Sequence, residues 1–254
     1  MSENPYAAPS AESAPQKPNT WLRWLINLSI GFGVIVVGLA LLLPNVRRAG
    51  PSAYKLQCMG NIRSIAIALR NYETAYQALP PAYTVDQDGK PLHSWRTLIL
   101  PFLDERRVYK KIDLSKAWDD PVNAEAYNTN LDVFHCHLAD CPQSHTTYLA
   151  VVGIGSCFHP TKPRFLSEIT DDHAETLMVI EVSPDKAVHW MAPADADEQT
   201  VLGLGPKSKL SHASGVNAVF VDGSARFLSV NMDPLVRHAL ISIDASDSVT
   251  AGRK

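Results

Sequence analysis

The feature that most constrains this chain is a run of twenty uncharged residues from Trp24 to Leu43. As an α-helix, a run of that length rises about 30 Å, which matches the hydrocarbon core of a bilayer. Trp21 and Trp24 stand at one end of the run, and amphipathic indole rings favour the level of the lipid headgroups. The run therefore predicts a single transmembrane helix over residues 21–43.

Two other interpretations of the run fit less well. A cleaved signal peptide has a shorter apolar core, a basic start and a small-residue cleavage site, and the segment LLLPNV offers no such site. A buried core helix of a soluble protein is seldom apolar on every face for five turns. The preceding residues 1–20 contain four prolines and no large aliphatic side chain, which predicts a disordered tail.

Residues 44–79 predict an amphipathic stalk helix that continues from the membrane segment. Its apolar side chains recur at steps of three and four residues, at Met59, Ile62, Ala66 and Leu69. Arg63 and Arg70 fall on the other side of the helix. Pro44 and the pair Gly50-Pro51 should interrupt any continuous rod between the membrane and the rest of the chain.

Residues 80–254 contain short apolar runs separated by turns, which predicts a globular head with antiparallel β-structure in an α+β protein. The clearest element is a hairpin, in which VNAVFV and ARFLSV flank the turn Asp222-Gly223-Ser224. A terminal helix should follow, with Asp233 as its N-cap and Pro234 in its first position.

The charge of the chain does not predict a nucleic-acid partner, because 23 basic and 26 acidic residues give a net charge of −3. The expected partner is the lipid bilayer. All four cysteines follow the apolar run, and an even set of cysteines in a tethered domain suits an oxidising space. We therefore expect a head outside the cytoplasmic membrane, in the periplasm or at the cell surface. Reduced thiols in a cytoplasmic head are the alternative.

A longer stretch of sequence carries a family resemblance. The segment from LALLLPNVRRAG to KIDLSKAWDDPVN is followed by YLAVVGIGSCF, ITDDHAETLMVIEV and HWMAPADAD. His212 then precedes Asp222-Gly223 with nine residues between them. These ordered segments, from about Leu39 to Leu235, resemble a large planctomycete family of unknown function that has a type IV pilin-like N-terminus. The same family has also been labelled solute-binding-like.

The resemblance implies a pilin-like fold and a pseudopilin-like, non-catalytic protein of the cell envelope, similar in its front part to the major pseudopilin of type II secretion. Such a protein would self-associate through its N-terminal helix or bind other envelope proteins. Pilin-like helices carry a Gly before the cleavage site and a Glu soon after it, where this chain has Leu22 and Asn27. We therefore expect permanent membrane anchoring of the uncleaved monomer at least as strongly as assembly into filaments. The alternative function is a membrane-anchored module that binds a solute or another ligand.

The resemblance also implies a disulfide between Cys58 and Cys136, which fall where the family usually has cysteines, with Cys141 and Cys157 as an extra pair. The residues alone permit three complete pairings and do not choose among them. A zinc site is the other interpretation, because His135, Cys136, His137, Cys141 and His145 crowd together, with Cys157 and His159 close behind. Their spacing matches no standard zinc site, so we expect no metal.

His212 and Asp222 could act as an acid and a base, but a structural role fits them better. Asp222 before Gly223 can close the hairpin turn by accepting a hydrogen bond from its own backbone, and His212 can bond to a loop carbonyl. We therefore expect no catalytic residue.

Three aromatic residues, Trp95, Trp118 and Trp190, are possible binding residues. A pocket lined by them would favour the ligand-binding alternative, although aromatic side chains in a small head are more often part of its core. No phosphate-binding or dinucleotide-binding motif is present, so we expect no cofactor.

Overall fold

The computed structural model of the chain describes residues 20–42 and 51–244. The chain divides into two compact units, Met1–Arg48 and Ala49–Lys254, and we call the second unit the head. The described helix of the first unit is α1 (Thr20–Leu42). The α-helices described in the head are α2 (Pro51–Tyr76), α3 (Trp95–Leu98), α4 (Arg106–Tyr109), α5 (Ala124–Tyr127), α6 (Glu198–Leu202) and α7 (Pro234–Ala239). Its strands are β1 (Tyr83–Val85), β2 (Pro91–Ser94), β3 (His145–Thr146), β4 (Tyr148–Ala150), β5 (Leu177–Glu181), β6 (Val188–His189), β7 (Gly215–Phe220) and β8 (Ala225–Ser229).

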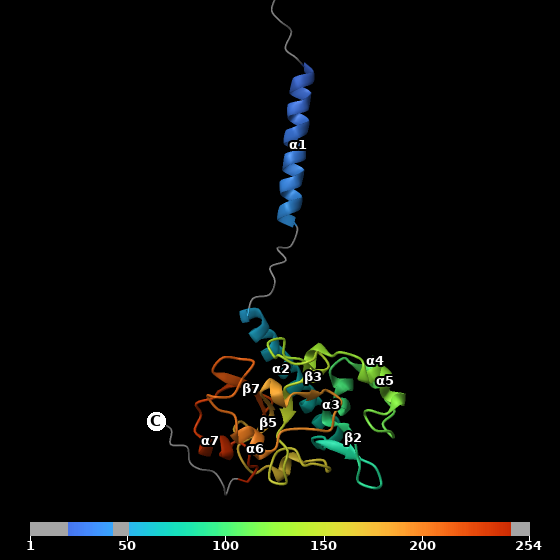
Figure 1. Ribbon diagram of the computed structural model, residues 1–254, viewed down its shortest axis with the longest axis vertical. Coiled ribbons are helices and arrows are strands. Elements are labelled where there is room, and N and C mark those ends of the chain that lie inside the picture. The colour runs from blue at the N-terminus through green and yellow to red at the C-terminus, as the bar shows by residue number, and fades with distance from the viewer. Residues whose placement is uncertain (1–19, 43–50, 245–254) are drawn as a thin grey trace, which may run out of the picture. The chain divides into compact units, whose positions relative to one another are not determined.

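Helix α1 covers the apolar run that dominates the sequence (Figure 1). Its large apolar side chains between Trp24 and Val37 are exposed, among them Phe32. The predicted membrane segment over residues 21–43 coincides with α1 except at Leu43, which lies outside the described residues together with most of the predicted tail. Among residues 20–42 and 51–244, no helix combines the length and the apolarity that crossing a bilayer requires.

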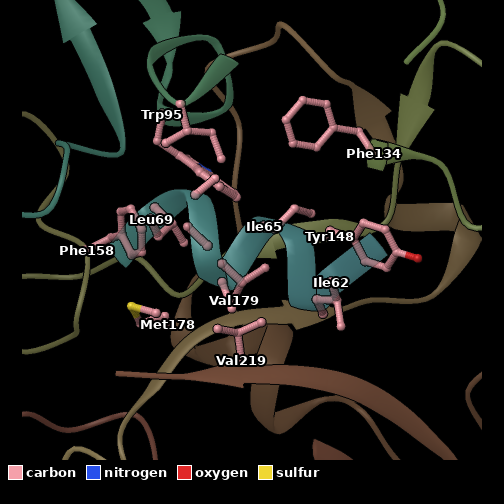
Figure 2. Packing of buried hydrophobic residues seen from close by; sticks show 14 of the residues in the cluster. Ile62, Ile65, Leu69, Trp95, Phe134, Tyr148, Phe158, Met178, Val179 and Val219 are labelled. Carbon is pink, nitrogen blue, oxygen red and sulfur yellow. The ribbon is translucent and has the colours of Figure 1, made fainter. Parts of the chain in front are cut away.

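Helix α2 forms where the stalk helix is predicted, but it is part of the head. Its buried side chains are Cys58, Ile62, Ile65, Ala66, Ala68 and Leu69. Figure 2 shows Val179 and Val219 on one side of α2 and Trp95 and Phe134 on the other. The helix predicted as a stalk over residues 44–79 therefore lies largely in the core of the head, and residues 44–50 fall outside the described part of the chain.

A four-stranded antiparallel sheet with the strand order β4-β5-β7-β8 packs against α2. Every residue of the central strands β5 and β7 is buried, because both faces of the sheet are covered. Successive side chains point to opposite faces of a strand. Val179 and Val219 accordingly pack in one cluster with α2, whereas Ile180 and Ala218 pack in a second cluster with Val201 of α6.

The predicted hairpin and terminal helix are present. Strands β7 and β8 pair around a turn in which Gly223 has a φ of +85°, a conformation that favours glycine. Helix α7 begins at Pro234, and the Oδ1 atom of Asp233 accepts a hydrogen bond from the backbone N–H of Leu235. A turn that contains Asp88-Gly89 likewise connects an antiparallel pair, β1 and β2.

A buried ion pair joins α3 to the loop before α6. The guanidinium of Arg96 is fully buried, and its Nη1 atom lies 2.6 Å from Oδ1 of Asp195. Arg96 also donates hydrogen bonds to the backbone carbonyls of Trp190, Ala192 and Ala194. The same Oδ1 atom of Asp195 accepts hydrogen bonds from Nε1 of Trp95 and from the backbone N–H of Ala150. This network fixes several loops around the first edge of the four-stranded sheet.

Candidate functional site

The structure brings three reactive side chains together inside the head, those of Cys58, Cys136 and His212. The two Sγ atoms lie 2.9 Å apart, and Nε2 of His212 lies 3.6 Å from Sγ of Cys136. The ligand atoms of all three residues lie within 4.8 Å of one another. None of the three side chains is more than 2% exposed. We call these residues the Cys–His cluster.

Three separate segments supply the Cys–His cluster. Cys58 lies in the first half of α2, Cys136 follows the single-turn helix η3 (Asp132–Phe134), and His212 forms an isolated bridge with Gly215 at the start of β7. Asn61, one helical turn after Cys58, donates hydrogen bonds from Nδ2 to the carbonyls of Asp132 and His135, at 2.7 and 3.1 Å. Asn61 therefore holds the segment with Cys136 against α2.

Two polar residues of the central strands support His212. The Oε2 atom of Glu181, at the end of β5, lies 3.2 Å from Nε2 of His212 and accepts a hydrogen bond from Nδ2 of Asn217 in β7, at 2.8 Å. Glu181 is only 1% exposed, and its Oε1 atom has no hydrogen-bond partner among the described residues. A buried carboxylate requires a compensating charge, which the imidazolium of His212 supplies.

The protonation of the cluster follows from these contacts. Burial lowers the pKa of His212, but hydrogen bonds and charge interactions with Cys58 and Glu181 outweigh burial and raise it to about 9. The pKa of Cys58 is lowered, mainly because the thiol of Cys136 forms a hydrogen bond with it and also because His212 lies beside it. The same sulfur–sulfur interaction, together with burial, raises the pKa of Cys136. The cluster thus contains one acidic thiol beside an imidazolium.

We expect His212 to make the stability of the head depend on pH. Its pKa is about 9 in the folded chain and about 6.5 in an unfolded chain. Protonated His212 therefore stabilises the fold fully below pH 6.5, and this contribution is lost as the pH rises through 9. The measurement is urea unfolding of the full chain and of its His212→Gln variant, in detergent, at several pH values from 6 to 9.5. The difference in unfolding free energy between the two proteins should shrink as the pH rises.

A matched control is His238→Gln. Nε2 of His238 lies 3.3 Å from Oε1 of Glu198, but both side chains are about half exposed, so solvent screens the pair. This variant should differ little from the unmodified chain at any pH. A difference between the unmodified chain and His212→Gln that stays constant from pH 6 to 9.5 would contradict the prediction.

The geometry favours covalent sulfur chemistry over metal binding. In a tetrahedral zinc site, Zn–S bonds of about 2.3 Å separate two thiolates by about 3.7 Å. The Sγ atoms of Cys58 and Cys136 are closer than that, at 2.9 Å, and both cysteines are free thiols in the structure. Two thiols at this separation can be oxidised to a disulfide by a small movement toward the bond length of about 2.05 Å.

The structure places the other predicted cysteines and histidines apart from this pair. Cys157 is buried in the core and Cys141 is half-buried, and both are free. Burial raises the pKa of both thiols, so neither is activated. Of the histidines and cysteines that crowd between residues 135 and 159, only Cys136 belongs to a potential metal-binding group in the described chain. The Cys58–Cys136 bond and the pairing of Cys141 with Cys157 both stay predictions.

The two ends of the His-x9-Asp-Gly motif have different roles. Asp222 accepts a hydrogen bond at Oδ1 from the backbone N–H of Ser224, at 2.8 Å, as expected for a residue that closes the hairpin turn. His212 contacts Cys136, Glu181 and Asn217 instead of the loop carbonyl that the sequence suggested. Glu181 and Asn217 are not among the residues that the sequence predicted for this site. The available signal was a single polar residue in each of two otherwise apolar strands, LMVIE and GVNAVF.

The three tryptophans do not form a common groove. Trp95 and Trp190 are buried in the core, and their indole N–H groups donate to Asp195 and to the carbonyl of Thr129. Trp118 is half-buried beside the rings of Tyr127 and His189. Trp95 and Trp190 are therefore not the ligand-binding residues that the sequence suggested, because side chains that fill the core are not available to a ligand.

Comparison with known proteins adds a family match for one part of the chain. Neither the curated proteins nor the solved structures gave a match. Residues 48–149 match the model of a family described as a protein of unknown function, DUF1559, with the short name SBP_bac_10. The match includes Cys58 and Cys136, whereas Glu181, His212 and Asn217 lie beyond it. Over residues 48–149, the chain is thus similar to a family whose function is not known.

Proposed function

We propose that this chain is a membrane-anchored, pseudopilin-like structural or assembly protein of the cell envelope, without catalytic activity. The observation that carries the proposal is the contrast between two consecutive helices. One side of α2 is buried in the head, with Ile62, Ile65 and Leu69 fully covered, whereas α1 has exposed apolar side chains all along residues 24–37, such as Trp24 and Phe32. A contiguous exposed apolar surface of this kind requires a lipid or protein environment.

The sequence around α1 supports lipid as that environment. Arg23 is the single charged residue of α1, and the uncharged run continues to Leu43. The length of the run fits a bilayer. Gly31, Gly33 and Gly38 have open space where a side chain would be, and small residues allow apolar helices to approach each other closely. The same helix is therefore the proposed surface for self-association or for binding other envelope proteins.

Two properties of the head support a non-catalytic role outside the cytoplasmic membrane. The reactive side chains that meet in the described part of the head are buried, so they present no group to a substrate. The closeness of Cys58 and Cys136 suits a compartment in which disulfides form and persist.

One observation favours a second candidate, a membrane-anchored ligand-binding module. A cavity of about 750 Å³ lies beside α6, and its lining includes Lys186, Lys207, Lys209, Asp185 and Asp197. Its volume is typical of ligand sites, but such sites are mostly apolar, and this lining is largely charged and polar. The structural role remains the leading proposal, because the lining of this cavity differs from that of most ligand sites.

We expect the full chain to remain with membranes after an alkaline wash and to leave them only in detergent. A variant in which residues 20–42 are replaced by a Gly/Ser linker of equal length should move to the soluble fraction, because it lacks α1. External protease should digest the head in intact spheroplasts. Recovery of the full chain in the soluble fraction would overturn the proposal, and so would protection of the head from the protease.

Native mass spectrometry of the detergent extract separates the two candidates. Oligomers of the full chain that are lost with the linker variant support the assembly role. A monomer that retains a bound small molecule supports the ligand-binding module instead.

A further inference from the structure

Cys58 marks the point at which α2 enters the core of the head. The side chains described before it, from Ala53 to Gln57, are exposed or half-buried, whereas Cys58 is fully buried. Its neighbour Cys136 is 78 residues further along the chain. A covalent bond between them would close a long loop, and it would fasten α2 to the segment that follows η3.

We propose that Cys58 and Cys136 form a redox-sensitive disulfide clamp, in which His212 and Glu181 are positioning residues that stabilise the reduced pair. The distances that carry this proposal are 2.9 Å between the two Sγ atoms, 3.6 Å from Sγ of Cys136 to Nε2 of His212, and 3.2 Å from that nitrogen to Oε2 of Glu181. The proposal goes beyond the function above, because it concerns the chemistry of the sulfur pair and not the location of the chain.

Oxidation by a low-molecular-weight or protein disulfide balances as two exchange steps. The Cys58 thiolate attacks one sulfur of the oxidant, so that a mixed disulfide forms, the bond of the oxidant breaks and one thiol leaves. The Cys136 sulfur then attacks the Cys58 sulfur, the new S–S bond forms and the second thiol leaves. The two departing groups carry away the two electrons that Cys58 and Cys136 lose. The second leaves with the proton of Cys136, and the first leaves as a thiolate that takes its proton from water, so both end as thiols.

Access to the pair depends on α2. Both sulfurs are fully buried, and a cavity of about 150 Å³ reaches His212 without including either cysteine in its lining. Exchange with an oxidant therefore requires the N-terminal part of α2 to separate from the segment with Cys136, or takes place as α2 docks during folding. The rate of oxidation therefore depends on how often α2 opens. The equilibrium between disulfide and dithiol is a better test of the role of His212.

The charged neighbours distinguish this pair from an inert structural disulfide. Placing Glu181 and His212 in the interior costs desolvation free energy, and a disulfide alone does not require them. An imidazolium beside a thiol favours the thiolate. Whatever stabilises the reduced form makes the disulfide easier to reduce. His212 thus makes the clamp reversible, and Glu181 keeps His212 charged.

The first test maps the bond in the full chain, purified in detergent without reductant. Free thiols are alkylated after denaturation, and peptides are analysed without reduction. We expect most molecules to contain a peptide that joins Cys58 to Cys136. Recovery of both cysteines as alkylated thiols would overturn the proposal. Stoichiometric zinc in the same preparation, measured by elemental analysis, would overturn it as well.

The second test is the equilibrium of the full chain with oxidised and reduced dithiothreitol. His212→Gln should shift the equilibrium constant about tenfold toward the disulfide, because the reduced pair loses its imidazolium. If the substitution only loosened the fold, the Cys58–Cys136 bond would become easier to reduce. The equilibrium would then shift toward the dithiol and not toward the disulfide. His238→Gln, the exposed counterpart, should leave the constant unchanged. No shift in His212→Gln, or a shift toward the dithiol, would overturn the role of His212.

A third measurement needs no variant. If Cys58 is a thiolate in the reduced chain and Glu181 keeps His212 protonated in both forms, reduction by dithiothreitol releases one proton. Reduction should then become about tenfold more favourable for each unit of pH between 6 and 8. The titratable groups that interact with Cys58 are Cys136, His212 and Tyr148, and Glu181 acts on His212 and Cys136. Burial raises the pKa of Tyr148, so it stays neutral. An equilibrium that does not depend on pH would indicate two ordinary thiols and overturn the proposal. These three tests use purified protein, so their results do not depend on whether the chain is anchored in a membrane. The proposed clamp and the proposed function can therefore fail independently.

Discussion

Replacing Arg96 with methionine should destabilise the head by about 3–5 kcal/mol, because it leaves a buried carboxylate without its partner. Oδ1 of Asp195 would lose its contact at 2.6 Å, and the carbonyls of Trp190, Ala192 and Ala194 would each lose a donor. Methionine fills much of the volume of arginine, so the loss reports mainly on charge and hydrogen bonding. The measurement is the free energy of urea unfolding of the full chain in detergent.

The matched control for Arg96→Met is Lys111→Met. Nζ of Lys111 also lies 2.6 Å from a carboxylate oxygen, that of Glu125, but both side chains of this pair are substantially exposed. An exposed pair contributes about 0–1 kcal/mol, because water and salt screen it. Similar losses in the two variants would mean that Arg96 is not the buried centre of the network.

Truncation of Leu69 to alanine should cost about 2–5 kcal/mol, because it opens a cavity in the middle of the core. Leu69 is fully buried on the inner side of α2, within the cluster that includes Val179 and Val219. The cost depends on how far the surrounding side chains relax into the space. Urea unfolding of the full chain measures it.

Ile67→Ala on the same helix is the control for Leu69→Ala. Ile67 is 61% exposed, so its truncation should change the unfolding free energy by about 0.5 kcal/mol or less. The two substitutions remove apolar groups from opposite sides of α2, two residues apart. If α2 were a free stalk, both variants would be close to neutral, which would contradict the fold described here.

Several elements could be predicted from local signals. The β7–β8 hairpin has a glycine in its turn, and α7 has an N-capping aspartate followed by a proline, so neighbouring residues determine both. The spacing of apolar residues in α2 likewise predicted a helix with one buried side. These signals act within a few residues of one another, and they do not depend on the rest of the fold.

The environment of α2 and most of the Cys–His cluster could not be predicted from such signals. Burial of α2 requires packing against β5 and β7, which follow it by about a hundred residues or more. Glu181 and Asn217 meet His212 only because the register of the sheet places them there. The closeness of Cys58 and Cys136 agrees with the pair that the family resemblance implied, but composition and spacing left the pairing open.

The position of α2 has a mechanical consequence. The first helix of the head, α2, also contributes fully buried side chains to its core, so tension transmitted along the chain from the N-terminal side acts directly on that core. To leave the core, α2 must lose its contacts with the strands on one side and with Trp95 and Phe134 on the other. A bond between Cys58 and Cys136 would fasten the N-terminal half of α2 to the segment that follows η3 and would oppose this withdrawal.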